Sequence, residues 1–189
     1  MQFATVKALE TWLRKPLGSS IGYEFGTGWT ATTAILLWSS GVRRQHLVDV
    51  EWDLTRELFA HCVEQFQRLE PEQHLTAPFA SSELSSYGIN YHAPADATHL
   101  PFAAGSIDFI TSTNTLKHIP RESLRRIFIE CRRAMRSHPL MSHVIDYCDE
   151  YSHPDRSIGP YNFLRYTACA WSIYNPSSHY QNRLRHSDI

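Results

Sequence analysis

The sequence predicts an α/β fold: a doubly wound, Rossmann-like and mostly parallel sheet in three α-β-α layers. Two observations lead to this class. Short apolar runs typical of strands alternate with segments of helical periodicity, and the first strand-to-helix crossing contains Gly26-Thr27-Gly28. Because a β-α-β order joins neighbouring parallel strands through a helix, the alternation indicates a parallel sheet covered by helices. A length of 189 residues suits one domain.

The composition is that of an ordinary globular protein. Apolar residues make up 42% of the chain, and 18 basic residues nearly balance 19 acidic ones. The resulting net charge of −1 gives no general attraction to nucleic acid or to an anionic membrane, so we expect a small-molecule partner. The sequence has neither an apolar run of about 20 residues nor a signal-peptide pattern, which predicts a cytoplasmic protein.

Four cysteines are scattered without a Cys-x-x-Cys pair, and we expect them to be reduced and mostly buried: Cys62, Cys131, Cys148 and Cys169.

The first part of the chain is expected to form a helix, a strand and a second helix. A helix over residues 4–14 has apolar side chains on one face and ends before Pro16. An apolar run predicts the first strand at 21–25. Helix-forming residues follow at 31–38, and the turn residues Ser39-Ser40-Gly41 end that helix.

The next two strands are shorter. Residues 46–50 predict the second strand, and Asp53 can cap the helix that follows, in which apolar residues repeat at helical spacing as far as Phe66. Residues 70–88 lose this periodicity and contain prolines and serines, which predicts a loop or a short irregular helix. Residues 89–93 give a weak third strand.

The remaining elements close the sheet. Residues 106–111 predict the fourth strand, and Pro120 opens a helix that runs to Met135. Residues 140–145 predict the fifth strand. Beyond it, we expect one helix at 161–174 and the start of another at 181–185.

Polar residues follow each of the five strands. In an open parallel sheet, ligands bind beyond the carboxyl ends of the strands, near the point where the strand order reverses. We therefore expect one crevice to contain the residues at these ends: Glu24 with Gly26 and Gly28, Asp49, Asp96, Asn114 and Asp146.

The residue types suit a nucleoside. Gly26 and Gly28 let main chain approach an amino acid moiety, while Glu24 can order the loop by accepting main-chain hydrogen bonds. Asp49 follows Gly28 by 21 residues, the distance at which a carboxylate can accept both ribose hydroxyls. Asp96 can accept a hydrogen bond from an adenine amino group. The predicted cofactor-binding set is completed by Thr27, Ala97 and Asn114.

From about residue 20 to 147 the chain resembles the class I S-adenosylmethionine-dependent methyltransferases, and in particular their small-molecule branch. The resemblance is carried by Glu24-Phe25-Gly26-Thr27-Gly28, Asp49, Ala95-Asp96-Ala97-Thr98-His99-Leu100-Pro101-Phe102, Gly105-Ser106-Ile107-Asp108-Phe109-Ile110 and Leu116-Lys117-His118-Ile119-Pro120. It implies S-adenosyl-L-methionine as cofactor, with the first loop at its methionine part, Asp49 at the ribose and Asp96 by the adenine.

The chain departs from the family pattern in four places. Thr30 stands where a third glycine is common and narrows the room near the cofactor, and Lys117 replaces the usual Glu and reverses a charge beside the pocket. Residues 136–139 replace a basic-Pro-Gly-Gly turn before strand five. The antiparallel hairpin that usually ends the fold is missing, so the fold is expected to be C-terminally shortened. Strand five would then be a bare edge, through which a homodimer is possible.

Methyl transfer needs a general base only when the acceptor is protonated. The candidate catalytic residues are His118, His143, Asp146 and His153. His143, Asp146 and His153, together with Asp149, also suit a metal site, although a polar substrate wall without metal is the preferred interpretation. The aromatic segment after strand five either covers the sheet face or forms an acceptor pocket.

We expect a single domain over 1–189, with an N-terminal helix in 1–18, a cofactor-binding core in 19–147 and an aromatic substrate or lid segment in 148–189. The predicted function is methyl transfer to a small-molecule or saccharide-like acceptor. Two alternatives stay open: a non-catalytic methyltransferase-like domain that serves as a binding partner or scaffold, and a nicotinamide dehydrogenase, in which the segment from Asp96 to Phe102 would have no role.

Overall fold

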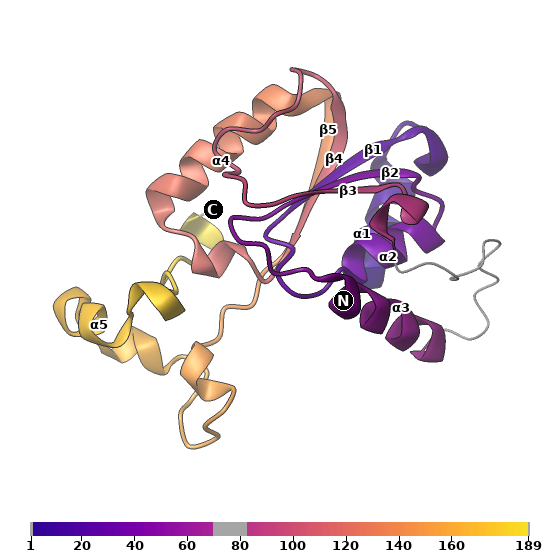
Figure 1. The fold of residues 1–189 in the computed structure, drawn as a ribbon. Coiled ribbons are helices and arrows are strands. Elements are labelled where there is room, and N and C mark those ends of the chain that lie inside the picture. Colours follow the sequence, from indigo (N-terminus) through magenta and orange to yellow (C-terminus); the bar gives the residue numbers. More distant parts are fainter. Residues whose placement is uncertain (1, 70–82, 189) are drawn as a thin grey trace.

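The computed structural model describes residues 2–69 and 83–188, and its centre is a five-stranded sheet (Figure 1). The strand order is β3-β2-β1-β4-β5, and every neighbouring pair is parallel. The bounds are Ile21–Phe25 for β1, Arg44–Val48 for β2, Ile89–His92 for β3, Ile107–Thr113 for β4 and Met135–Val144 for β5. The predicted doubly wound α/β fold is confirmed, and the sheet is wholly parallel rather than mostly parallel. The strand order reverses between β1 and β4, which is where ligands bind in such sheets.

Helices cover both faces of the sheet (Figure 1). On one face lie α1 (Gln2–Trp12), α2 (Thr32–Ser39) and α3 (Arg56–Leu69), and their buried side chains form a core with Leu47, Ile89 and Phe109 of the sheet. On the other face, α4 (Arg121–Ala134) buries Leu124, Ile127 and Cys131 against residues of β1 and β4. The apolar spacing that predicts each helix therefore forms the two cores of a three-layer structure.

Two sequence expectations about element ends are wrong. Asp53 does not cap α3: the helix begins at Arg56, and the Leu58 amide donates to the Thr55 hydroxyl at 3.3 Å. Strand five begins at Met135 and includes residues 136–139, which lie in a register irregularity between the pairs Ile107–Met135 and Phe109–Leu140. The expected turn is therefore a bulged strand, in which the irregularity absorbs the extra residues.

The segment after β5 differs most from the expectation. The single helix predicted over 161–174 is divided into a 3₁₀ turn at Asn162–Arg165 and α5 (Ala168–Tyr174), and 181–185 contains no helix. Part of the loop expected at 70–88 lies outside the described residues, and its end forms a 3₁₀ turn at Leu84–Tyr87.

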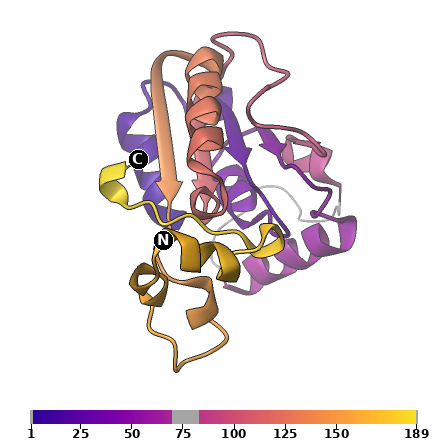
Figure 2. The ribbon, with the colours of Figure 1, turned by 90° about the vertical axis from the view of Figure 1, so that its left-hand side faces the viewer.

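Figure 2 shows the segment after β5 beyond the carboxyl ends of the strands, away from the sheet faces. Its aromatic rings pack mainly on one another: Phe163 and Tyr166 each lie against Trp171. Coverage of the sheet face, the simpler of the two expectations for these rings, therefore does not describe the segment as a whole. The four cysteines are free as expected, but only Cys62 and Cys131 are buried.

Among the described residues, none of the helices has the length and apolar character that crossing a membrane requires.

The pairing of β1 with its parallel neighbour β4 leaves no room for a side chain at Gly22, which lies opposite Phe109. A Cβ placed there would overlap the ring of Phe109, which is fully buried. We expect Gly22→Ala to lower the free energy of unfolding by about 1–3 kcal/mol, as overpacking of a core does. Gly159→Ala is the matched control, because its Cβ would meet no atom within 4 Å. Urea denaturation checks both, and equal midpoints for the two variants would contradict the close packing.

Candidate functional site

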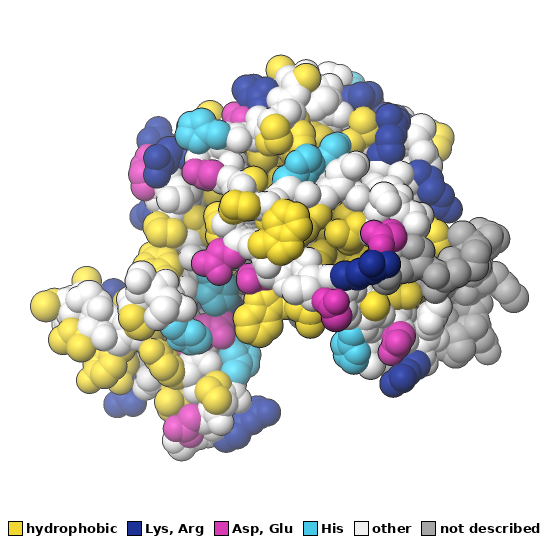
Figure 3. Space-filling model, viewed as in Figure 1, with side chains coloured by type: hydrophobic (Ala, Val, Ile, Leu, Met, Phe, Trp, Pro, Cys, Tyr) yellow, Lys and Arg dark blue, Asp and Glu magenta, His cyan; other side chains and the backbone are white. Residues whose placement is uncertain are grey.

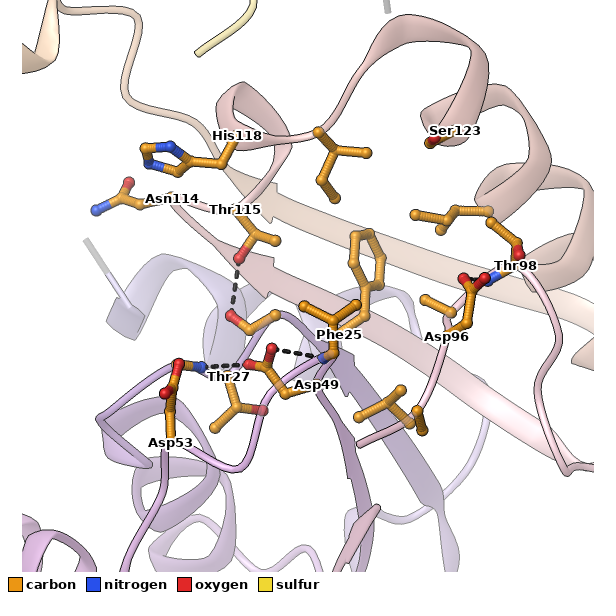
Figure 4. A pocket seen from close by; sticks show the side chains of 18 of the residues that line it. Phe25, Thr27, Asp49, Asp53, Asp96, Thr98, Asn114, Thr115, His118 and Ser123 are labelled. Atoms are coloured by element: carbon orange, nitrogen blue, oxygen red, sulfur yellow. Dashed lines mark hydrogen bonds between the residues drawn. The ribbon is translucent and has the colours of Figure 1, made fainter. Parts of the chain in front are cut away.

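A pocket of about 640 Å³ lies beyond the carboxyl ends of β1, β2 and β4 (Figure 4). Seven of the eight predicted cofactor-binding residues line it: Gly26, Thr27, Gly28, Asp49, Asp96, Ala97 and Asn114. The eighth, Glu24, is buried behind the glycine loop. The structure therefore brings together residues that lie as much as 88 positions apart in the sequence, from Gly26 to Asn114.

The glycine loop has the backbone form that only glycine adopts readily. Gly26 has φ of 68° and Gly28 has φ of 59°. A Cβ at Gly26 would overlap the side chain of Thr115, whose hydroxyl donates to the Gly26 carbonyl at 2.8 Å. A Cβ at Gly28 would meet nothing within 4 Å. Packing against Thr115 therefore requires a glycine at position 26, whereas the space beside Gly28 is open to the pocket.

Asp49 ties the glycine loop to the end of β2. Its Oδ2 accepts from the Gly28 amide at 2.6 Å, and its Oδ1 accepts from the Val50 amide at 2.7 Å. Each carboxylate oxygen has a second lone pair, so Asp49 can still accept hydrogen bonds from a ligand. Its carboxylate lies between the loop and the pocket (Figure 4).

Asp96 lies across the pocket from Asp49 (Figure 4). Its Oδ1 accepts from the Thr98 amide at 2.8 Å, and this hydrogen bond holds the pKa of Asp96 below its ordinary value. The exposed carboxylate is therefore ionised and oriented at the pocket wall. Asn114 has φ of 57° and lies near His118 at a third side of the pocket.

Glu24 is the most unusual charge in the site. It is 5% exposed, and its Oε2 has no hydrogen-bond partner. Burial, opposed by a hydrogen bond with Thr33 and assisted by the nearby charge of Asp49, raises the pKa of Glu24 to about 7. The expected main-chain hydrogen bonds from the loop to this carboxylate are not formed. A buried, half-satisfied carboxyl destabilises the chain by itself, which is typical of a functional position.

The candidate catalytic residues fall into two groups. His118 lines the pocket, and its Nδ1 lies 3.0 Å from the Tyr180 carbonyl while its Nε2 lies 3.4 Å from Glu150 Oε1. Asp146 and His153 do not line the pocket but lie near His118 through Glu150 and Lys117.

His143 stands apart from this group. It extends from β5 between the rings of Phe25 and Phe128, with Nδ1 2.7 Å from the Ser112 hydroxyl. Burial lowers the pKa of His143 to about 4, and its Nε2 has no partner. The side chain is absent from the pocket lining.

Two departures from the family pattern do not alter the pocket wall. Neither Thr30 nor Lys117 lines the pocket. Burial alone would lower the pKa of Lys117, but hydrogen bonds to Asp146 and Glu150 outweigh it and raise the pKa. The positive charge of Lys117 is therefore neutralised inside the protein and does not face the pocket.

The set of residues that the sequence suggested as metal ligands is partly wrong. Of the four residues, Asp149 is fully buried and holds a turn, with Oδ1 accepting from Tyr151 and Gln181. His143 lies elsewhere. The ligand atoms that come within 4.8 Å of one another belong to Asp146, Glu150 and His153. Glu150 was not foreseen, because nothing in its local sequence indicates that the turn brings it back to Asp146.

Sequence reasoning also missed several lining residues. Some follow a predicted residue directly, as Val50 and Thr98 do, and adjacency could have identified them. Ser123 and Arg126 come from the first turns of α4, and only the packing of that helix over the sheet brings them to the pocket.

The fold and the position of the pocket define a doubly wound α/β domain whose ligand site lies at the reversal of strand order. Residues 54–141 match a protein family described as a methyltransferase domain. This match confirms the resemblance to the class I S-adenosylmethionine-dependent methyltransferases. None of the curated protein sequences matches the chain.

Several solved structures have a similar fold. Phosphoethanolamine N-methyltransferase 1 of Haemonchus contortus is 16% identical, with a TM-score of 0.47 over 79% of this chain and 27% of that one. Geranyl diphosphate C-methyltransferase of Streptomyces coelicolor is 11% identical, with a TM-score of 0.44 over 71% and 41%. An S-adenosylmethionine-dependent methyltransferase of Mesorhizobium loti is 16% identical, with a TM-score of 0.42 over 71% and 48%. The chain therefore spans less than half the length of each.

The buried Glu24 predicts a pH-dependent stability. A carboxyl whose pKa rises from 4.5 to about 7 on folding binds its proton more tightly in the folded chain. Its contribution to the free energy of unfolding therefore falls as the pH rises from 4.5 to 7. We expect Glu24→Gln to be more stable than the intact chain at pH 8 by about 3 kcal/mol.

The measurement is urea denaturation of both proteins between pH 4.5 and 8. At pH 4.5 most of this stability difference should be lost, because Glu24 is then protonated in the folded chain and about half protonated in the unfolded chain. A stability difference between the two proteins that does not vary with pH would contradict the raised pKa of Glu24 in the folded chain.

Proposed function

We propose that the chain binds S-adenosyl-L-methionine in the described pocket and transfers its methyl group to a polar small molecule. One observation carries the proposal. The open glycine loop, Asp49 and Asp96 line the same cavity, at the point where the strand order reverses. These are the groups that an amino acid, a ribose and an adenine require, in that order along the pocket wall. The match of residues 54–141 to a methyltransferase domain supports the same cofactor.

The residues present fit this cofactor. The open space at Gly28 admits a ligand against main chain, and Thr27 has a buried hydroxyl without a partner. We assign residues 26–28 to the methionine part, Asp49 to the ribose hydroxyls, and Asp96 with Ala97 to the adenine. Asn114 lies across the pocket from Asp96 and is assigned to the methionine end (Figure 4).

The bound cofactor would supply an electrophilic methyl group on a sulfonium. Displacement is in line, so the protein acts chiefly by aligning the acceptor and excluding water. His118 is the candidate base, because among the four candidate catalytic residues it is the one that lines the pocket, while its Nε2 lies 3.4 Å from the Glu150 carboxylate. Asp146 and His153 lie behind His118 and act through it, whereas the position of His143 does not favour a role at the reacting atoms.

The acceptor is proposed to be a small molecule or a saccharide-like compound. Polar side chains on the pocket wall support this proposal, because they suit a hydroxylated or amine-bearing ligand. They are Asp53, Asn114 and His118. We propose that residues 148–189 contribute to acceptor binding, since Tyr180 contacts His118 directly. Cytoplasmic location and a homodimer through β5, the edge strand of the sheet, stay predictions.

The second candidate function is a non-catalytic methyltransferase-like domain that acts as a partner or scaffold. Thr30, Lys117 and the expected C-terminal shortening are the departures from the family pattern that suggest it, but neither Thr30 nor Lys117 lines the pocket. The discriminating experiment incubates the chain with labelled S-adenosyl-L-methionine and a mixture of small amines, hydroxy acids and saccharides. Labelled product with any acceptor would exclude the non-catalytic function.

Cofactor binding is tested at Gly28 by titration calorimetry with S-adenosylhomocysteine. We expect Gly28→Ala to weaken binding by about tenfold or more, because a methyl group would occupy the space assigned to the ligand. Gly105→Ala is the matched control: Gly105 has φ of 65°, its Cβ would meet nothing within 4 Å, and it lies outside the pocket lining. Both variants carry the same left-handed strain, of about 1–2 kcal/mol.

The control variant should bind like the intact chain. No binding by the intact chain at millimolar S-adenosylhomocysteine would reject the proposed cofactor. Equal affinities for the two alanine variants would reject the placement of the ligand beside Gly28.

A further inference from the structure

A compact group of charges joins the C-terminal segment to the rest of the protein. Lys117 Nζ lies 2.6 Å from Asp146 Oδ2 and also contacts Glu150 Oε1. Asp146 Oδ2 in turn lies 3.0 Å from His153 Nε2. Figure 3 shows histidine and acidic side chains gathered at this junction. One ammonium group therefore holds two carboxylates, one from the loop after β5 and one from the 3₁₀ turn Glu150–Ser152.

The geometry is that of a cation site. Asp146, Glu150 and His153 each present one ligand atom, and these atoms lie within 4.8 Å of one another. Two carboxylate oxygens and an imidazole nitrogen are ligands that suit divalent ions such as Zn²⁺. Lys117 brings a cation to the two carboxylates. Its side chain is only 8% exposed, so its charge is compensated by this group and not by water.

We propose that Lys117 is the built-in cation of a three-ligand site formed by Asp146, Glu150 and His153. The ammonium group makes the attachment of residues 146–153 independent of any metal ion. Removal of the lysine side chain leaves two carboxylates close together without a counter-charge, which is a costly arrangement that a divalent ion can relieve.

The site is linked to the pocket but is not part of it. Glu150 bridges Lys117 to His118, which lines the pocket, and the amide of Asn182 donates to the Lys117 carbonyl at 2.6 Å. The Asn182 side chain donates to the carbonyls of Leu116 and Ile119. The chain on both sides of His118 is therefore held by Asn182, while the Lys117 ammonium links this segment to Asp146 and Glu150. This inference holds whether or not the chain transfers methyl groups.

The experiment compares Zn²⁺ binding by the intact chain and by Lys117→Ala, using titration calorimetry and thermal unfolding. We expect the variant to bind one more Zn²⁺ than the intact chain. Zn²⁺ should raise the unfolding temperature of the variant and leave that of the intact chain nearly unchanged. Because scattered histidines bind Zn²⁺ weakly, the Zn²⁺ bound by the intact chain is subtracted as background.

Two further variants make the result specific. Lys117→Arg keeps the positive charge and should gain no Zn²⁺ site. The double variant Lys117→Ala with His153→Ala lacks one ligand and should bind the extra Zn²⁺ at least about tenfold more weakly than Lys117→Ala. Equal binding by the single and double alanine variants would place the ion elsewhere and overturn the proposal.

Lys117→Ala can also fail to fold without a cation. In that case Zn²⁺ in the refolding buffer should restore a cooperative unfolding transition, and the double alanine variant should not be restored. Absence of restoration, or identical Zn²⁺ stoichiometry for the intact chain and a folded Lys117→Ala, would overturn the proposal.

Discussion

The close approach of the Gly26 backbone to Thr115 is the constraint on which the site depends. These two residues lie just after β1 and β4, the neighbouring strands between which the order of the sheet reverses. The Thr115 hydroxyl holds the Gly26 carbonyl, and any side chain at position 26 would push the two loops apart. With the loops fixed, Asp49 can reach the Gly28 amide, and the pocket opens on the other side of the same short turn.

Two buried charged residues near this turn, Glu24 and Lys117, differ in how far their charges are paired within the protein. Glu24 is buried with a partnerless oxygen, so the site contains a charge that the fold alone does not favour. Lys117 is buried as deeply, yet it meets two carboxylates and holds the segment after β5 in place. The Glu24 carboxyl keeps one oxygen without a partner, whereas the charge of Lys117 is paired with two carboxylates inside the protein.

The sequence predicted the strands and helices of the sheet domain well, because each is indicated by residues close together in the chain. Five apolar runs and the periodicity of α3 and α4 indicate the elements, and parallel connection follows from their alternation. The end of the chain could not be predicted in this way. Residues 161–174 have helical composition but are divided, since Phe163 and Tyr166 both turn toward Trp171. Likewise residues 136–139 belong to β5, but they lie in the irregularity between the paired residues Met135 and Leu140, which only the neighbouring strand β4 defines.

The sequence by itself determined the fold class, the glycine loop and the order of polar residues along the strand ends, because each depends on spacing along the chain. Only the tertiary structure decided which of these residues share a cavity. It brought Ser123 and Arg126 to the pocket by packing α4 over the sheet, removed His143 to the interior, and turned Lys117 away from the pocket toward Asp146 and Glu150. The physical reason is that the direction of a side chain depends on the elements packed around it, which lie far away in the sequence.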